Sequence, residues 1–130
     1  MIDVSAVLGQ LLAEAEADYA ERVLGEVAVN GAVVPPLFWY EVRNVLVVAE
    51  RRGRLRADQS DLFLGALGDL PIEAEGVPSD ERATGIARAH GLTIYDAACL
   101  ELAQRRSLPL ATLDAGMVRA AESLGLQRVR

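Results

Sequence analysis

The strongest constraint on the fold is the alternation, along the chain, of short apolar runs with longer segments of helical periodicity. Ala32-Val33-Val34 is a short β-branched run that Pro35 and Pro36 end, which predicts a buried strand. A helical pattern follows over residues 37–52, and Gly53 stops it. Strands that alternate with helices favour a parallel sheet covered on both faces. The sequence therefore predicts an α/β fold.

The same reasoning predicts the other elements. Further helices are expected over residues 5–12, 16–29, 57–70, 93–106 and 115–124, with one more that Ser79 caps and Gly91 ends. Further strands are expected in a very short segment ahead of Asp3, after Pro71 through Ile72, Ala74 and Val77, and over residues 108–112 and 126–129. Because no linker divides these elements, residues 1–130 are expected to form one domain.

Composition excludes several classes of chemistry. All 13 basic residues are arginine, so the chain lacks the lysine that Schiff-base enzymes and P-loop proteins need. The single cysteine, Cys99, forms no internal disulfide, which fits a reducing cytoplasm. No apolar run reaches the length of a membrane span, and no basic region precedes the first apolar stretch, so neither a membrane segment nor a signal peptide is expected. The net charge of −6 argues against nucleic acid as a partner, unless several acids bind metal.

Four acidic residues stand at equivalent places in this pattern. Asp3 and Asp114 each follow a predicted strand, while Glu41 and Asp96 lie in the first turns of predicted helices. The carboxyl ends of parallel strands line one crevice, so the four carboxylates are expected at a common rim. Clustered carboxylates repel one another, and a hard divalent cation such as Mg²⁺ or Mn²⁺ removes the conflict. Such a site predicts metal-assisted phosphoryl transfer.

Each acid also has a simpler interpretation. Thr93 and Asp96 resemble a capping box, and Asp114 stands where an N-cap is expected. Glu41 is harder to explain in this way, because it lies beside the apolar face of its helix. His90 ends a helix and is interpreted as structural, and Cys99 as a buried apolar residue.

Two surface features allow a choice of roles. A basic cluster follows the 37–52 helix and is either a solvated helix end or a set of phosphate contacts; its members are Arg51, Arg52, Arg54 and Arg56. Phe38, Trp39 and Tyr40 span about 200° of helix, so they cannot all face one core. With Phe38 in the core, Trp39 or Tyr40 is expected beside Glu41, either as a partner contact or covered by another helix.

Four segments resemble the PIN domain family, and within it the VapC toxins. Asp3-Val4-Ser5-Ala6 resembles the family's opening D-x-S-A. Pro35 followed by Glu41-Val42 and Asn44-Val45-Leu46 is similar to a P…EV-x-N-x-L helix. The segments 92–98 (LTIYDAA) and 108–114 (LPLATLD) resemble L-T-x-Y-D-A and L-P-L-A-T-x-D. These motifs occur in order and span nearly the whole chain.

The resemblance implies an α/β/α sandwich with a central, mostly parallel sheet flanked by helices. It implies an Mg²⁺- or Mn²⁺-dependent endoribonuclease with Asp3, Glu41, Asp96 and Asp114 as catalytic, metal-binding acids. Ser5 and Thr112 match the family's supporting hydroxyl positions, and Asn44 matches its helix asparagine. The implied partners are RNA, a VapB-type antitoxin and a second copy of the chain. The alternatives are a housekeeping PIN nuclease for RNA maturation and a non-catalytic PIN-fold binding module.

Overall fold

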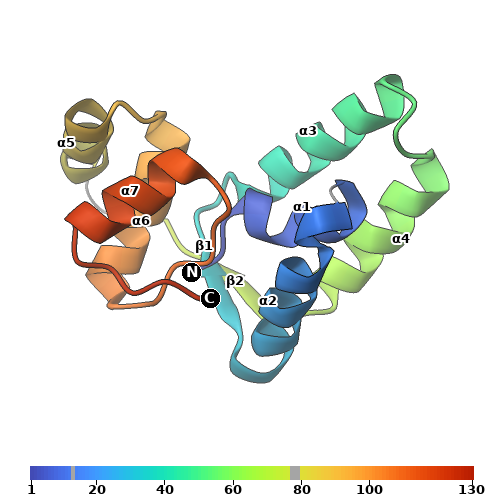
Figure 1. Cartoon of the computed structure of the whole chain (residues 1–130), viewed down its shortest axis with the longest axis horizontal. Helices are drawn as coiled ribbons and strands as arrows, with labels where there is room; N and C mark the ends of the chain where they lie inside the picture. The colour runs from blue at the N-terminus through green and yellow to red at the C-terminus, as the bar shows by residue number, and fades with distance from the viewer. Residues whose placement is uncertain (13, 77–79) are drawn as a thin grey trace.

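The computed structural model describes residues 1–12, 14–76 and 80–130 and contains a series of helices around short parallel strands (Figure 1). In chain order the elements are α1 (Val4–Leu12), a 3₁₀ turn (Glu14–Glu16), α2 (Ala17–Asn30), β1 (Ala32–Val34), α3 (Phe38–Arg51), α4 (Ala57–Gly68), β2 (Ile72–Ala74), α5 (Asp80–His90), α6 (Ile94–Arg106) and α7 (Ala115–Ser123). The predicted helices are confirmed, with ends that differ by one or two residues. Val77 and Ser79, expected in a strand and as a helix cap, lie outside the described residues.

The sheet is less extensive than the sequence predicts. β1 and β2 pair in parallel with Ala32 opposite Ile72. The expected strands at the start of the chain and over residues 108–112 and 126–129 are reduced to two parallel bridges, Ile2 to Ala111 and Leu110 to Arg128. Pairing stops early because Pro109 has no amide hydrogen to donate, and because the chain turns towards α7 after Thr112. The parallel direction of every pairing is as predicted.

The helices form two layers, one on each side of the strands (Figure 1). Helices α1 to α4 enclose one apolar core, and α5 to α7 enclose a second. Alternate residues of β1 serve the two cores, because Val34 is buried in the first and Val33 packs against the second. This arrangement is the predicted α/β/α sandwich, and it brings the first turns of α3 and α6 to the same end of the strands.

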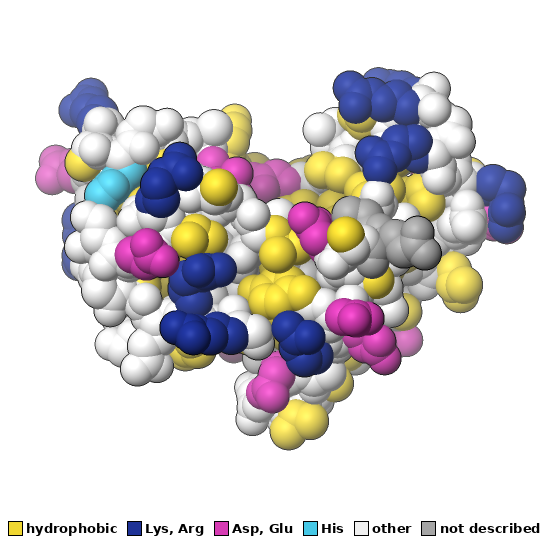
Figure 2. All heavy atoms as spheres, viewed as in Figure 1, with side chains coloured by type: hydrophobic (Ala, Val, Ile, Leu, Met, Phe, Trp, Pro, Cys, Tyr) yellow, Lys and Arg dark blue, Asp and Glu magenta, His cyan; other side chains and the backbone are white. Residues whose placement is uncertain are grey.

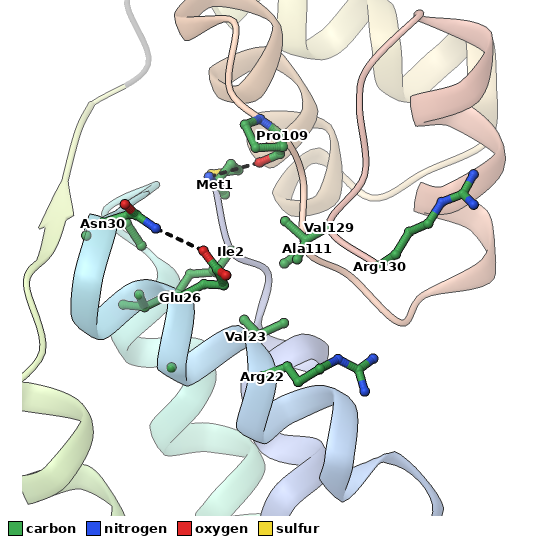
Figure 3. A pocket seen from close by; sticks show the side chains of 14 residues that line it. Met1, Ile2, Arg22, Val23, Glu26, Asn30, Pro109, Ala111, Val129 and Arg130 are labelled. Atoms are coloured by element: carbon green, nitrogen blue, oxygen red, sulfur yellow. Dashed lines mark hydrogen bonds between the residues drawn. The ribbon is translucent and has the colours of Figure 1, made fainter.

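An apolar hollow of about 560 Å³ lies at the opposite end, where the strands begin (Figure 3). Ile2 and Ala32 both line it, together with Val23 and Val27 of α2 and Val129 near the C-terminus. In the described part of the chain no bridge joins the Ile2 segment to β1, so the parallel pairings form two separate ladders.

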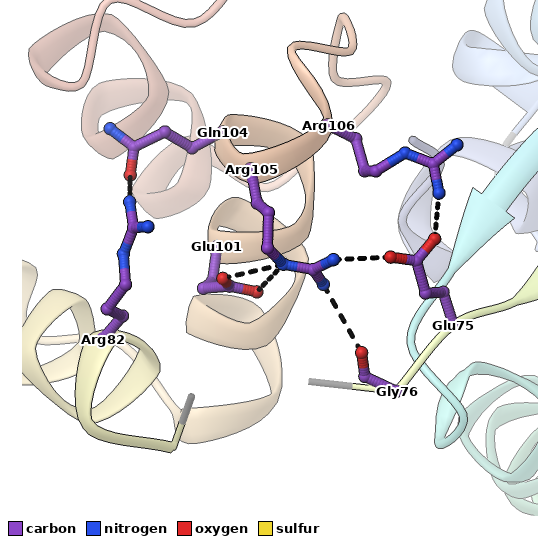
Figure 4. A network of polar contacts seen from close by, with 7 residues as sticks. All are labelled: Glu75, Gly76, Arg82, Glu101, Gln104, Arg105 and Arg106. Atoms are coloured by element: carbon purple, nitrogen blue, oxygen red, sulfur yellow. Dashed lines mark hydrogen bonds and ion pairs between the residues drawn. The ribbon is translucent and has the colours of Figure 1, made fainter. Parts of the chain in front are cut away.

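A charge network ties α6 to the segment that follows β2 (Figure 4). Glu101 is completely buried, and the Arg105 guanidinium donates to its carboxylate at 3.0 Å. Arg105 also pairs with Glu75, which accepts a further hydrogen bond from Arg106. The network holds two segments together that are some 30 residues apart in sequence. None of the described helices combines the length and apolar character needed to cross a bilayer.

Candidate active site

The Asp3 carboxylate is held rigidly where the first segment leaves the sheet. Its backbone N–H donates to the Ala111 carbonyl at 2.9 Å, and only 6% of the residue is exposed. Asp3 Oδ2 accepts hydrogen bonds from Ser5 Oγ at 2.5 Å, from Ser5 N at 3.2 Å and from Thr112 Oγ1 at 3.0 Å. Three donors on one oxygen fix the direction of the carboxylate.

The two hydroxyls that contact Asp3 also organise the loop before α7. Ser5 Oγ accepts from Leu113 N at 2.9 Å, and the fully buried Thr112 Oγ1 accepts from Asp114 N at 3.1 Å. The Ser5 and Thr112 hydroxyls are themselves 3.2 Å apart. The side chains of Ser5 and Thr112 thus join the first segment of the chain to the loop that carries Asp114.

Glu41 and Asp96 lie near other carboxylates and have no cation partner among the described residues. Burial, followed by the charges of Asp3 and Asp96, raises the pKa of Glu41 above its ordinary value. Burial also raises the pKa of Asp96, the hydrogen bond with Thr93 opposes that shift, and the charges of Asp3 and Asp114 add to it. Asp3, Asp96 and Asp114 therefore each act electrostatically on another of the four predicted acids.

Two of the simpler, capping interpretations are also correct. Asp114 Oδ1 accepts from Met117 N at 2.8 Å and caps α7. Thr93 Oγ1 accepts from Asp96 N at 3.1 Å and caps α6. Capping occupies only one oxygen of Asp114, so it does not compete with a second role for the other.

A hollow of about 430 Å³ opens between the first turns of α3 and α6. Glu41 and Asn44 line it from α3, and Tyr95 and Asp96 line it from α6. A smaller adjoining hollow is lined by Asp3, Glu41 and Cys99, among other residues. Burial and the nearby carboxylates raise the pKa of Cys99 well above its usual value, so its thiol stays protonated and, as predicted, serves as a buried residue.

The donor chemistry of this site fits a hard divalent cation. All four predicted ligands are carboxylates, whose mutual repulsion a cation would relieve. Within the described ranges no three acidic, histidine or cysteine side chains are placed to hold a single ion together. Mg²⁺ commonly binds through one or two carboxylates and several waters, which suits such a spacing. The four-carboxylate metal site stays a prediction.

The predicted basic cluster lies at the turn between α3 and α4, where Figure 2 shows basic side chains gathered. Arg54 donates to the Leu12 carbonyl at 2.6 Å, and Arg56 pairs with Asp58 at 3.0 Å. Arg51 and Arg52 are exposed and have no ion-pair partner in the part of the chain that the structure describes. The cluster therefore contains two fixed guanidinium groups and two free ones.

The aromatic run divides as its helical spacing predicts. Phe38 is buried, and Trp39 packs edge-on against it with ring centroids 5.4 Å apart. The Arg43 guanidinium lies over the Trp39 ring at 5.9 Å, so Trp39 is largely taken up by packing. Tyr40 is 73% exposed beside Glu41. Sequence reasoning missed Tyr95, although Tyr95-Asp96 repeats the Tyr40-Glu41 pairing and could have marked it.

The chain forms a parallel α/β/α domain. At the carboxyl ends of its strands lies a hollow lined by acidic side chains, and these two features together define its class. The model of the PIN domain family matches residues 1–123, and the chain belongs to that family. Ribonuclease VapC3 from Pyrobaculum aerophilum is 33% identical over 118 residues, which are 88% of each protein. The crystal structure of PAE2754 from the same organism shares the fold, with a TM-score of 0.71 and 22% identity over 92% of this chain and 83% of that one.

Proposed function

We propose that this chain is a divalent-metal-dependent endoribonuclease of the VapC type, which hydrolyses RNA phosphodiester bonds at the carboxylates of Asp3, Glu41, Asp96 and Asp114. The observation that carries the proposal is that Glu41 and Asp96 line the hollow between α3 and α6 and that burial and the charges of the other acids raise the pKa of both. Perturbed acids in a cleft are typical of catalytic sites. The similarity to a protein named as a VapC ribonuclease supports the same activity.

The side chains divide into ligands and groups that position them. Asp3, fixed by Ser5 and Thr112, is the least mobile ligand, and Glu41 and Asp96 complete the site from the two helices. Asn44 lines the same hollow one turn after Glu41, where its amide can orient a phosphate or a water. A bound Mg²⁺ or Mn²⁺ would neutralise charge on the phosphodiester and activate water.

The basic cluster of Arg51, Arg52, Arg54 and Arg56 is proposed to contact the RNA backbone away from the cut. Ten residues of helix separate Glu41 from Arg51, a rise of about 15 Å, so RNA bound at the acids can reach the cluster. Arg51→Ala and Arg52→Ala should each weaken RNA binding and reduce its salt dependence by about one phosphate contact. Titration of RNA binding over a range of salt concentrations measures this, and an unchanged slope would assign both side chains to a solvated helix end.

We further propose that the protein acts in the cytoplasm as a homodimer that a VapB-type antitoxin inhibits. An inhibitor of this kind acts most directly by covering the acidic hollow and the exposed side chain of Tyr40 beside it. Trp39 contributes less to such a contact than the sequence predicts, because it is half-buried against Phe38. Co-purification with the product of an adjoining gene, followed by measurement of mass in solution, tests both partners.

The activity is tested with the purified protein and a long RNA transcript in EDTA, Mg²⁺ or Mn²⁺. We expect cleavage with either metal and none in EDTA. Asp96→Asn should reduce the rate by more than the roughly 10- to 100-fold that loss of an outer-shell partner costs a metal site. Asp61→Asn removes an equally charged but exposed carboxylate on α4 and should leave the rate unchanged. Cleavage that persists in EDTA or in Asp96→Asn would contradict the proposal.

A further inference from the structure

Exposed apolar side chains concentrate around the acidic hollow. Among the described residues seven large hydrophobic side chains are exposed, and four of these stand at the starts of α3 and α6; the four are Leu37, Tyr40, Ile94 and Tyr95. The other three are scattered over α2, α3 and α4. Exposed apolar side chains gathered at one place on a protein surface indicate a contact site.

The two exposed tyrosines flank the acids from opposite walls. Tyr40 precedes Glu41 on α3, Tyr95 precedes Asp96 on α6, and all four residues line the same hollow. Tyr40 is 73% exposed and Tyr95 is 52% exposed, and neither hydroxyl has a hydrogen-bond partner in the described ranges. The remaining tyrosine differs, because Tyr19 packs on the core and donates to the Val129 carbonyl at 3.1 Å. Packing of the domain therefore does not explain Tyr40 or Tyr95.

We infer that Tyr40 and Tyr95 are stacking platforms for the two unpaired bases that flank the scissile phosphate. The inference rests on the proposed ribonuclease function. A phosphate at the acids brings the bases on its 5′ and 3′ sides against the walls of the hollow, and the exposed side chains on these walls include two aromatic rings. Single-stranded RNA is bound in this way, by bases stacked on exposed aromatic side chains.

The charge of the molecule favours contacts of this kind. The chain has a net charge of −6, and the hollow itself is lined by carboxylates, so the electrostatic attraction that usually dominates RNA binding is weak here. The basic cluster is about 15 Å away along α3 and cannot hold the nucleotides at the cut. Stacking needs no positive charge, and it favours any unpaired base because every base has an aromatic face. Tyr40 and Tyr95 are therefore positioning residues for the substrate.

The test is a cycle that pairs changes in the protein with changes in the RNA. The substrate is a short RNA that contains one mapped cleavage position. In two further versions, the nucleotide on the 5′ or the 3′ side of that position is replaced by an abasic nucleotide. The proteins are wild type, Tyr40→Leu, Tyr95→Leu, and the matched Tyr→Phe variants, which keep the ring. Leu62→Ala, at an exposed position on α4, is the control for loss of exposed apolar surface.

On intact RNA we expect each Tyr→Leu variant to lose roughly 5- to 150-fold in kcat/KM, mainly through KM, and each Tyr→Phe variant to stay near wild type. On RNA that lacks the base over that tyrosine, the Tyr→Leu variant should match wild type. A purely structural role predicts the same loss on both RNAs, and that result would overturn the inference. Tyr→Leu variants that cleave normally but no longer dimerise or bind an antitoxin would also overturn it, and would assign the tyrosines to a protein contact. If the wild type cleaves no RNA with either metal, the proposed function fails, and the inference fails with it.

Discussion

The fold places acidic side chains in two different kinds of surroundings. Asp3 and Glu101 are buried, and the fold provides each with partners, two hydroxyls and an amide for the first and the Arg105 guanidinium for the second. Glu41 and Asp96 are half-buried and face other carboxylates. The partners of Asp3 and Glu101 hold these two side chains in fixed positions, while Glu41 and Asp96 are left with a repulsion between carboxylates that a cation would relieve. The difference locates the candidate active site more sharply than acidity alone.

The largest effect is expected from Arg105→Met, which removes the cation that pairs with the buried Glu101. Removing one partner of a buried pair is strongly destabilising, and the midpoint of thermal unfolding should fall by on the order of 10 °C. Arg106→Met is the matched control, because Arg106 is more exposed and pairs with Glu75 rather than with Glu101. Thermal unfolding followed by circular dichroism measures both. Equal small shifts would mean that Glu101 does not depend on Arg105.

The second effect concerns the support of Asp3. Thr112→Val keeps the shape of a fully buried residue but removes the donor to Asp3 Oδ2 and the acceptor for Asp114 N. Unsatisfied buried groups of this kind cost about 1–3 kcal/mol in the free energy of unfolding. The rate of RNA cleavage should fall as well, because Asp3 loses its fixed direction. Thr112→Ser keeps the hydroxyl and should retain most of the activity; if both variants behave alike, the hydroxyl does not position Asp3.

Local patterns predicted most of this architecture. The helices follow from apolar spacing and end signals, and the four acids follow from their places after strands or at helix starts. The extent of the sheet could not be predicted, because strand pairing depends on neighbours that are distant in sequence. Within the predicted strand 108–112, the described residues that form bridges are Leu110 and Ala111. The Glu75–Arg105 contact has no sequence signal for the same reason.

The exposure of aromatic residues was only partly predictable. Helical geometry correctly separated the buried Phe38 from the exposed Tyr40. Helical geometry did not show whether Trp39 packs within the protein or contacts a partner. The packing of Trp39 depends on the positions of Phe38 and Arg43 in three dimensions. Tyr95 appeared in the sequence only as part of a motif, and its importance depends on the placement of α6 opposite α3.

The smallest expected effect concerns Glu41, one of the two half-buried acids. Unlike the changes above, its replacement should raise the unfolding temperature. In metal-free protein the raised pKa of Glu41 means that its proton binds more tightly in the folded state. Its full contribution to stability is present below the ordinary pKa of a carboxyl group and is lost as pH rises through the raised value. Glu41→Gln removes this loss, so at neutral pH the variant should unfold about 1–3 °C higher than wild type. The difference should disappear at acidic pH, where Glu41 is protonated in both states.

Adding metal completes this test, because it distinguishes a metal ligand from an acid whose pKa is raised only by burial and neighbouring charges. Mg²⁺ or Mn²⁺ binds the ionised carboxylates of the folded protein and should raise the unfolding midpoint of wild type at neutral pH. Glu41→Gln has lost one proposed ligand, so the same metal concentration should stabilise it less and reduce or reverse its advantage. The exposed-site variant Asp61→Asn should respond to metal as wild type does. If wild type and Glu41→Gln gain equally from metal at every pH, Glu41 is not a ligand, and its raised pKa reflects only burial beside Asp3 and Asp96.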